Sequence, residues 1–189
     1  KATLLAWLHT IPEPVRLAMS NVCLDRWEGY VHAAEDALPH ATIVIDRFHV
    51  AQHDRGCVDT LRKDELNRLA KEKELSEAEL KQLKETLWPF RKPAHELHGE
   101  ERAQLALFFR HSPQLQRAYD LREDLTAIFD TAPTPEVAAL ELANWEQRVR
   151  DSSLDCFDPF LKLLATWRVY ILNYFKERKT SGFVEGLNN

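Results

Sequence analysis

Two apolar runs near the beginning of this chain have the composition of β-strands, and an aspartate directly follows each of them. Leu17–Leu24 ends at Asp25, and the β-branched run Thr42–Ile45 ends at Asp46. β-Branched and apolar residues fit the pleated, half-buried surface of a sheet. The segment between the runs, Arg26–Leu38, has helical spacing. We therefore predict a strand–helix–strand unit whose two strands are parallel neighbours.

The rest of the chain shows the spacing of apolar residues that is typical of helices. We predict helices over Leu4–His9, Phe48–Glu74, Ser76–Leu87, Gly99–His111, Ser112–Asp130, Thr134–Asp151 and Asp158–Lys179, with a proline-containing loop over Trp88–His98. Several of these helices start at capping signals, because Ser76 is followed by Glu79 in a capping box, and Ser112, Thr134 and Asp158 each precede a proline.

These predictions describe a predominantly helical chain with an α/β beginning. Residues 1–50 would form two strands and a helix, residues 51–179 an all-helical block, and residues 180–189 the start of a helix that carries Glu185. In open parallel sheets, functional residues gather beyond the carboxyl ends of the strands. Asp25 and Asp46 both stand at such ends.

Composition restricts the classes of partner. Hydrophobic residues make up 44% of the 189 residues, which is enough for a buried core, and the formal net charge is -5. Because the chain is acidic overall, any DNA contact must come from a local basic patch, and Pro159–Asn189 is one candidate. The alternative for that segment is a solvated helix face. The three cysteines form no close pair and no run spans a membrane, so a reducing cytoplasm is expected.

Three acidic residues stand where a metal site could form. Asp25 and Asp46 follow strands, and Glu185 opens a C-terminal helix. Carboxylates from separate elements can bind Mg²⁺, and two such ions can activate and stabilise the oxygens of a phosphodiester. The alternative is that these acids only cap turns and helices, which would fit a helical interaction module without an active site.

Two histidines one helical turn apart provide a different possibility. His49 and His53 would share one face of a helix and could bind zinc, although Val50 occupies the position of the glutamate in zinc proteases. The alternative is that each histidine is satisfied separately.

Several of these segments together resemble a known family. Asp25–Tyr30, Leu38–Ala41, Ile43–Val50 and Glu185–Asn188, with Ala118–Glu123, Ile128–Phe129, Trp145 and Ile171–Phe175 in the middle, resemble the ISL-three group of bacterial insertion-sequence transposases. The likeness runs from about Asn21 to the last residue. The Asp-Arg-Phe-His block and the Glu-Gly-x-Asn block, in this order, are its most specific parts.

The resemblance implies a ribonuclease H-like catalytic core with a large all-α insertion. It also implies Mg²⁺- or Mn²⁺-dependent cleavage and strand transfer on DNA at transposon ends and targets, by an enzyme of the bacterial cytoplasm that associates with the nucleoid when it acts. Asp25 would be the second carboxylate of the triad and Glu185 the third, with Asp46 inside the site or supporting it. His49 and Asn188 are the residues that the resemblance implies as DNA contacts or as supports of the metal ligands. Arg47, and Arg178 and Lys179 of the basic segment Pro159–Asn189, are further candidates for these roles.

The resemblance also implies what this chain alone does not provide. The family's first carboxylate lies on a core strand upstream of the matching segments, so we expect the 189-residue chain to be inactive by itself. Without that strand, the sheet should have an exposed edge, which favours homo-oligomers or pairing with another strand.

Overall fold

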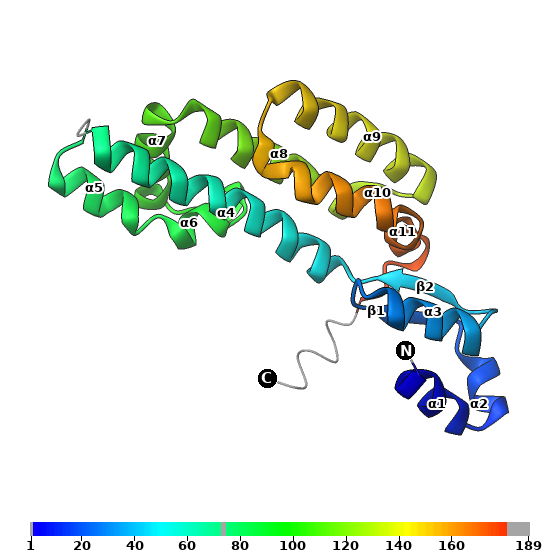
Figure 1. Ribbon diagram of the computed structural model, residues 1–189. Coiled ribbons are helices and arrows are strands. Elements are labelled where there is room, and N and C mark those ends of the chain that lie inside the picture. The colour runs from blue at the N-terminus through cyan, green and yellow to red at the C-terminus, as the bar shows by residue number, and fades with distance from the viewer. Residues whose placement is uncertain (1, 73–74, 181–189) are drawn as a thin grey trace. The chain divides into compact units, whose positions relative to one another are not determined.

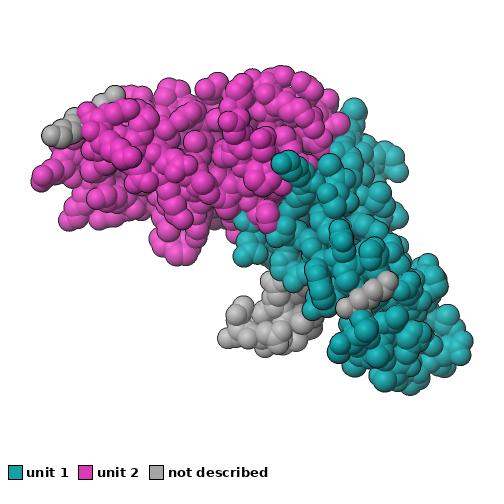
Figure 2. Space-filling view, in the orientation of Figure 1, with its two compact units in different colours: residues 1–52, 131–140, 162–189 teal, residues 53–130, 141–161 magenta. Residues whose placement is uncertain are grey.

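The computed structural model describes residues 2–72 and 75–180, which fold mainly as helices (Figure 1). They belong to two compact units (Figure 2). The first unit covers residues 1–52, 131–140 and 162–189, and the second covers residues 53–130 and 141–161. These units are defined by their compactness. The division expected from the sequence, at residues 50 and 179, separates α/β from helical segments and stays a prediction. In the described part of the chain, no helix combines the length and the apolar character needed to cross a bilayer.

The first unit contains a two-stranded parallel sheet made of β1 (Asn21–Leu24) and β2 (Thr42–Ile45). Asn21 pairs with Thr42, and Leu24 pairs with Ile45, so the two strands end at the same level. Helix α3 (Glu28–Ala37) connects them and packs against both. This confirms the predicted parallel neighbours.

The first half of the predicted strand Leu17–Leu24 is wrong, because residues 17 and 18 end a short helix. Helix α1 (Ala2–Thr10) and helix α2 (Glu13–Ala18) precede β1, and α1 packs on α3. Pro14 lies in the first turn of α2, where a helix needs no backbone N–H. Leu17 is 63% exposed, so its apolar side chain does not indicate a buried strand.

The predicted helix Asp158–Lys179 is interrupted near its end. It consists of α10 (Asp158–Leu172) and α11 (Tyr174–Glu177), and Arg178 ends it in the left-handed conformation, with φ 53°. Phe160, Leu164, Ile171 and Phe175 are buried along these two helices, whereas Trp167 is half-buried. Asn173 separates the two helices, and its side chain bonds to β2 instead of lying on the helix surface.

Helices make up the second unit. The remaining elements of the chain are α4 (Arg47–Glu72), α5 (Glu77–Lys84), α6 (Leu87–Arg91), η1 (Ala94–Glu96), α7 (Gly99–His111), α8 (Pro113–Thr131), α9 (Pro135–Ser152) and η2 (Asp155–Phe157). The capping box of Ser76 and Glu79 is present at α5. The loop predicted over residues 88–98 is partly wrong, because α6 and η1 form there. Pro89 lies in the first turn of α6, which tolerates proline.

Buried polar contacts fix the core of the second unit. Arg122 is 4% exposed, and its side chain donates to the backbone carbonyl oxygens of Phe90 and Lys92. Next to it, Glu123 accepts a hydrogen bond of 2.7 Å from the backbone of Ala94. Because a buried guanidinium needs partners, these bonds tie α8 to the proline-containing segment. The Ala118–Glu123 segment of the resemblance thus has a structural role.

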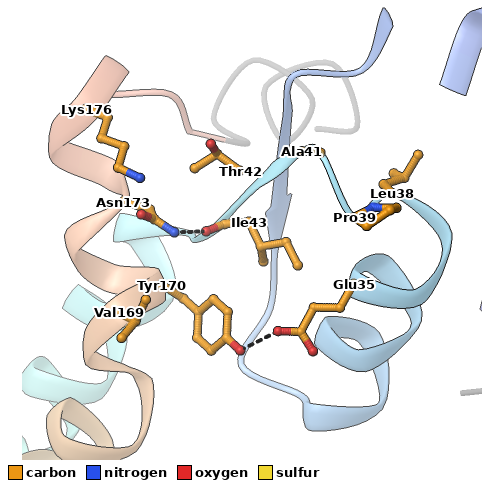
Figure 3. Close-up of a pocket in the computed structure, with 10 residues that line it drawn as sticks. All are labelled: Glu35, Leu38, Pro39, Ala41, Thr42, Ile43, Val169, Tyr170, Asn173 and Lys176. Atoms are coloured by element: carbon orange, nitrogen blue, oxygen red, sulfur yellow. Dashed lines mark hydrogen bonds between the residues drawn. The ribbon is translucent and has the colours of Figure 1, made fainter. Parts of the chain in front are cut away.

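In the first unit, Asn173 covers part of the outer edge of the sheet (Figure 3). Thr42 and Asp46 donate their backbone N–H groups to Ser20 and Leu24, on the side of β1. Because neighbouring residues of a strand point to opposite sides, the carbonyl group of Ile43 points away from β1. The Asn173 amide donates a hydrogen bond of 2.7 Å to this carbonyl oxygen. This bond covers one point of the outer edge of β2, and the exposed edge expected from the sequence stays a prediction.

We predict that Asn173→Ala lowers the free energy of unfolding by about 1–3 kcal/mol, because the Ile43 carbonyl loses its partner. Asn144→Ala is the matched control, since Asn144 is exposed on α9 and should change the stability little. Urea unfolding of both variants provides the comparison. Equal stability losses in the two variants would contradict the role of Asn173 at the sheet edge.

In the second unit, Asp54 is a buried carboxyl group with an unsatisfied oxygen. Asp54 is 3% exposed, and its Oδ1 atom has no hydrogen-bond partner. Burial raises the pKa of Asp54 to about 7, although the positive charges of Arg122 and Arg55 oppose the shift. The folded protein therefore favours the neutral acid, which has no charge to desolvate.

This pKa predicts a specific pH dependence. The folded state keeps the proton up to about pH 7, while the unfolded state releases it near the ordinary value of 3.8, so stability is lost as the pH rises between these values. The side chain introduced by Asp54→Asn stays neutral. As the pH rises from about 5 to about 7, the free energy of unfolding of this variant should therefore increase by about 2–3 kcal/mol relative to that of the unaltered protein. Urea unfolding across this range measures the gain. Asp64→Asn, on the exposed face of the same helix, should show none.

Candidate functional site

Asp25 and His49 meet beyond the carboxyl end of the sheet. Asp25 is the first residue after β1, and His49 lies in the first turn of α4. The His49 Nε2 atom contacts the Asp25 Oδ1 atom, and the two side chains are 29% and 54% exposed. Asp25 is therefore an accessible carboxylate that a neighbouring imidazole holds in place. Sequence analysis named both residues, but it did not predict that they pair.

Asp46 has a different environment from Asp25. It is 1% exposed, and its Oδ1 accepts a hydrogen bond of 2.7 Å from the backbone N–H of Phe48. Its own backbone N–H donates to Leu24, and its carbonyl oxygen accepts from His49 at 3.1 Å. Asp46 thus caps α4 and joins the ends of both strands to that helix. These bonds also fix the backbone of His49 next to Asp25.

The last described segment of the chain is tied to the sheet at several points. Glu177 Oε2 accepts a hydrogen bond of 3.2 Å from the Asn21 amide, at the start of β1. Arg47 donates to the hydroxyl group of Tyr174 at 3.4 Å. Together with the Asn173–Ile43 bond, these contacts place α11 against the sheet that bears Asp25 and Asp46.

The predicted basic DNA contacts near the C-terminus have partners within the first unit. Arg178 donates to the Ala132 carbonyl oxygen at 2.5 Å, and the Lys179 ammonium lies 2.7 Å from the Glu177 carboxylate. Lys179 is also near β1. Burial and the charge of Asp46 raise the pKa of the Cys23 thiol, and the Lys179 charge opposes them. A raised pKa disfavours the thiolate, which is the reactive form of cysteine.

A pocket of about 540 Å³ lies between the end of α3, β2 and the α10–α11 segment, within the first unit. Figure 3 shows how the Tyr170 hydroxyl group donates to Glu35, with a distance of 2.7 Å. No pattern in the sequence identified Tyr170 and Glu35 as contact residues. Asn173 stood in a segment of the resemblance, Ile171–Phe175, but nothing in its local pattern indicated a bond to β2.

The described residues include only some of the predicted metal ligands. Glu185 and Asn188, both named as candidate site residues, lie outside them. Across residues 2–72 and 75–180, no group of three His, Cys, Asp or Glu side chains is arranged to hold a metal ion. A zinc site on His49 and His53 therefore has no third ligand among these residues, and the His49 imidazole contacts Asp25 instead.

Comparisons with known proteins agree with the resemblance. A family model for DDE transposases of the ISL-three group, described as a transposase, matches residues 1–189. No curated protein and no solved structure gives a significant match. The match covers the whole chain, including the β1–α3–β2 unit and the helices that follow. The chain therefore belongs to the ISL-three group of DDE transposases.

Proposed function

We propose that this chain provides the second and third carboxylates for DNA cleavage and strand transfer by a DDE transposase, with Asp25 and Glu185 as ligands of Mg²⁺ or Mn²⁺. The observation that carries the proposal is the accessible Asp25 carboxylate, held by His49 at the carboxyl end of a parallel sheet. Such ends are where open parallel sheets place their ligands. Transposon ends and target DNA are the substrates that family membership implies.

The path of the chain supports a meeting of Asp25 and Glu185. The Glu177–Asn21 bond and the charge of Lys179 near Cys23 place the end of the described segment beside β1. Glu185 follows Lys179 by six residues, which can span at most about 20 Å. A strand of four residues is about 13 Å long. The linking segment is therefore long enough to bring Glu185 to the end of β1.

Asp25 is a better metal ligand than Asp46 in this arrangement. Asp25 uses one oxygen for His49 and is half-exposed, so its other oxygen can reach an ion and the waters that Mg²⁺ retains. Asp46 is buried and uses an oxygen to cap α4. We assign Asp46 the role of positioning His49, and His49 that of positioning Asp25.

The chemistry divides between the ions and the chain. Bound divalent ions would supply the activated oxygen nucleophile and the stabilisation of the leaving oxygen. The carboxylates of Asp25 and Glu185 would hold the ions, and His49 would keep the Asp25 carboxylate in one orientation. A ribonuclease H-like core needs a further acid on a neighbouring strand, and the outer edge of the half-buried β1 is where such a strand would pair. A strand of a longer protein or of a second copy could occupy it.

Metal binding tests the role of Asp25. We expect Asp25→Asn to weaken Mn²⁺ binding, measured by titration calorimetry, by about tenfold or more, because the ion loses a charged ligand. Asp124→Asn, which removes an exposed carboxylate on α8, is the control and should not change binding. Asp46→Asn should weaken Mn²⁺ binding less than Asp25→Asn does. Equal Mn²⁺ binding by the unaltered chain and by Asp25→Asn would favour the helical interaction module.

The nuclease activity of the 189-residue chain is a separate prediction. With only two of the three carboxylates, the charge needed to hold two ions is incomplete, so we expect no nicking of supercoiled plasmid in Mn²⁺. Gel electrophoresis of the plasmid detects a single nick. Nicking by the chain that disappears in Asp25→Asn would contradict the predicted inactivity while supporting the assignment of Asp25.

A further inference from the structure

The two strands are followed by the same kind of tripeptide. Asp25-Arg26-Trp27 follows β1, and Asp46-Arg47-Phe48 follows β2. Because the strands end in register, both tripeptides leave the same end of the sheet. Trp27 is 52% exposed and Phe48 is 50% exposed. Two large aromatic side chains are therefore half-exposed at the end of the sheet that carries the proposed metal ligand.

Trp27 is held in a fixed place relative to Asp25. Its backbone N–H donates to the Asp25 carbonyl oxygen at 2.8 Å, and its own carbonyl oxygen accepts from Tyr30, in the first turn of α3. Its ring meets the Tyr30 ring edge to face, with the centroids 4.4 Å apart. A Cβ atom added at Gly29 would come within 3.3 Å of the indole. The glycine thus makes room for a pre-positioned, exposed indole.

Arg26 adds a positive charge at the same place. Its guanidinium makes no hydrogen bond to the described residues, and it lies close enough to Asp25 to feel the charge of that carboxylate. Burial lowers the pKa of Arg26, and the charge of Asp25 opposes this shift. By contrast, Arg47 at the equivalent position after β2 donates to Tyr174. Arg26 therefore keeps five N–H donors that suit a phosphate group.

We propose that Arg26 and Trp27 bind one unpaired nucleotide of a DNA strand beside Asp25, with the guanidinium on a phosphate and the indole on the base. The inference rests on the proposed function, because it assigns this surface to the DNA that Asp25 would act on. Bases stack on exposed aromatic rings only when they leave the duplex stack, and such stacking tolerates any base. The site would thus recognise the aromatic face of the base and the charge of the phosphate, whichever base is present.

Binding to single-stranded DNA tests the proposal without metal. Fluorescence anisotropy of a labelled oligothymidylate of about 12 nucleotides, in EDTA, should show about 5- to 100-fold weaker binding by Trp27→Ala. Trp27→Tyr should retain most of the affinity, since tyrosine also stacks. Trp88→Ala, at a 69% exposed tryptophan of the second unit, is the matched control and should bind as the unaltered chain does. Binding to a blunt duplex should not respond to Trp27→Ala.

Arg26 has its own measurement. Arg26→Gln should reduce the slope of log affinity against log salt by about 0.7, the value for one phosphate contact on a single strand. Arg117→Gln, at an exposed position on α8, should leave the slope unchanged. Single-strand affinity in Trp27→Ala within twofold of the unaltered chain would overturn the proposal, as would an equal loss in Trp88→Ala. Far-UV circular dichroism verifies that each variant is folded.

The outcomes also separate this inference from the proposed function. If Mn²⁺ binding depends on Asp25 but single-strand affinity does not depend on Trp27, the nucleotide site is refuted and the metal site is supported. If single-strand affinity depends on Trp27 but Mn²⁺ binding does not depend on Asp25, the metal site is refuted and the nucleotide site is supported. If Trp27→Ala instead lowers self-association in sedimentation experiments and leaves oligothymidylate binding intact, the surface binds a second copy and the proposal is wrong.

Discussion

The parallel pairing of β1 with β2 is the interaction on which the candidate site depends. Twenty residues separate Asp25 from Asp46 along the chain, and the register of Leu24 with Ile45 brings them to the same end of the sheet. The hydrogen bond from the Asp46 N–H to the Leu24 carbonyl oxygen is the last one of this ladder. A shift by one residue would turn Asp46 away from β1 and would separate His49 from Asp25. The relative positions of Asp25, Asp46 and His49 therefore depend on this strand register.

A sheet of two short parallel strands cannot be stable by itself, because each strand needs cover on its faces and edges. In the first unit, α3 covers the strands that it connects, and the α10–α11 segment bonds to Ile43, Asn21 and Arg47. The same contacts bring the C-terminal part of the chain back to the first strands. A segment that follows a helical excursion of more than a hundred residues is thus tied to the sheet that carries Asp25.

Sequence patterns predicted the local elements better than the contacts between them. β2 and α7 have the predicted bounds, and the capping signals at Ser76, Ser112 and Thr134 start helices, because these features depend on neighbouring residues. Leu17 was misread because an apolar residue can lie exposed on a short helix. The break at Asn173 could not be read locally, since the Asn173 side chain bonds to the Ile43 carbonyl group, 130 residues away.

The candidate site was predictable only in part for the same reason. An aspartate after a strand is visible in the sequence, but whether it is accessible or serves as a helix cap depends on the following turn. Asp25 is followed by a turn in which Trp27 bonds to the Asp25 backbone, so its side chain stays available to His49 and solvent. Asp46 is followed at once by α4, so its side chain takes the N–H of Phe48. Two similar tripeptides thus acquire different roles.

Charge sets a further condition on how this site can bind DNA. The chain is acidic overall, and of the basic residues near the site, Arg178 and Lys179 bond to Ala132 and Glu177. Arg26 adds positive charge directly beside Asp25. Arg26 attracts a phosphate that approaches Asp25, and the carboxylates repel it, so a divalent ion bound at the carboxylates would remove the repulsion. The ions that take part in cleavage would therefore strengthen a DNA affinity that Arg26 and Trp27 already provide without metal.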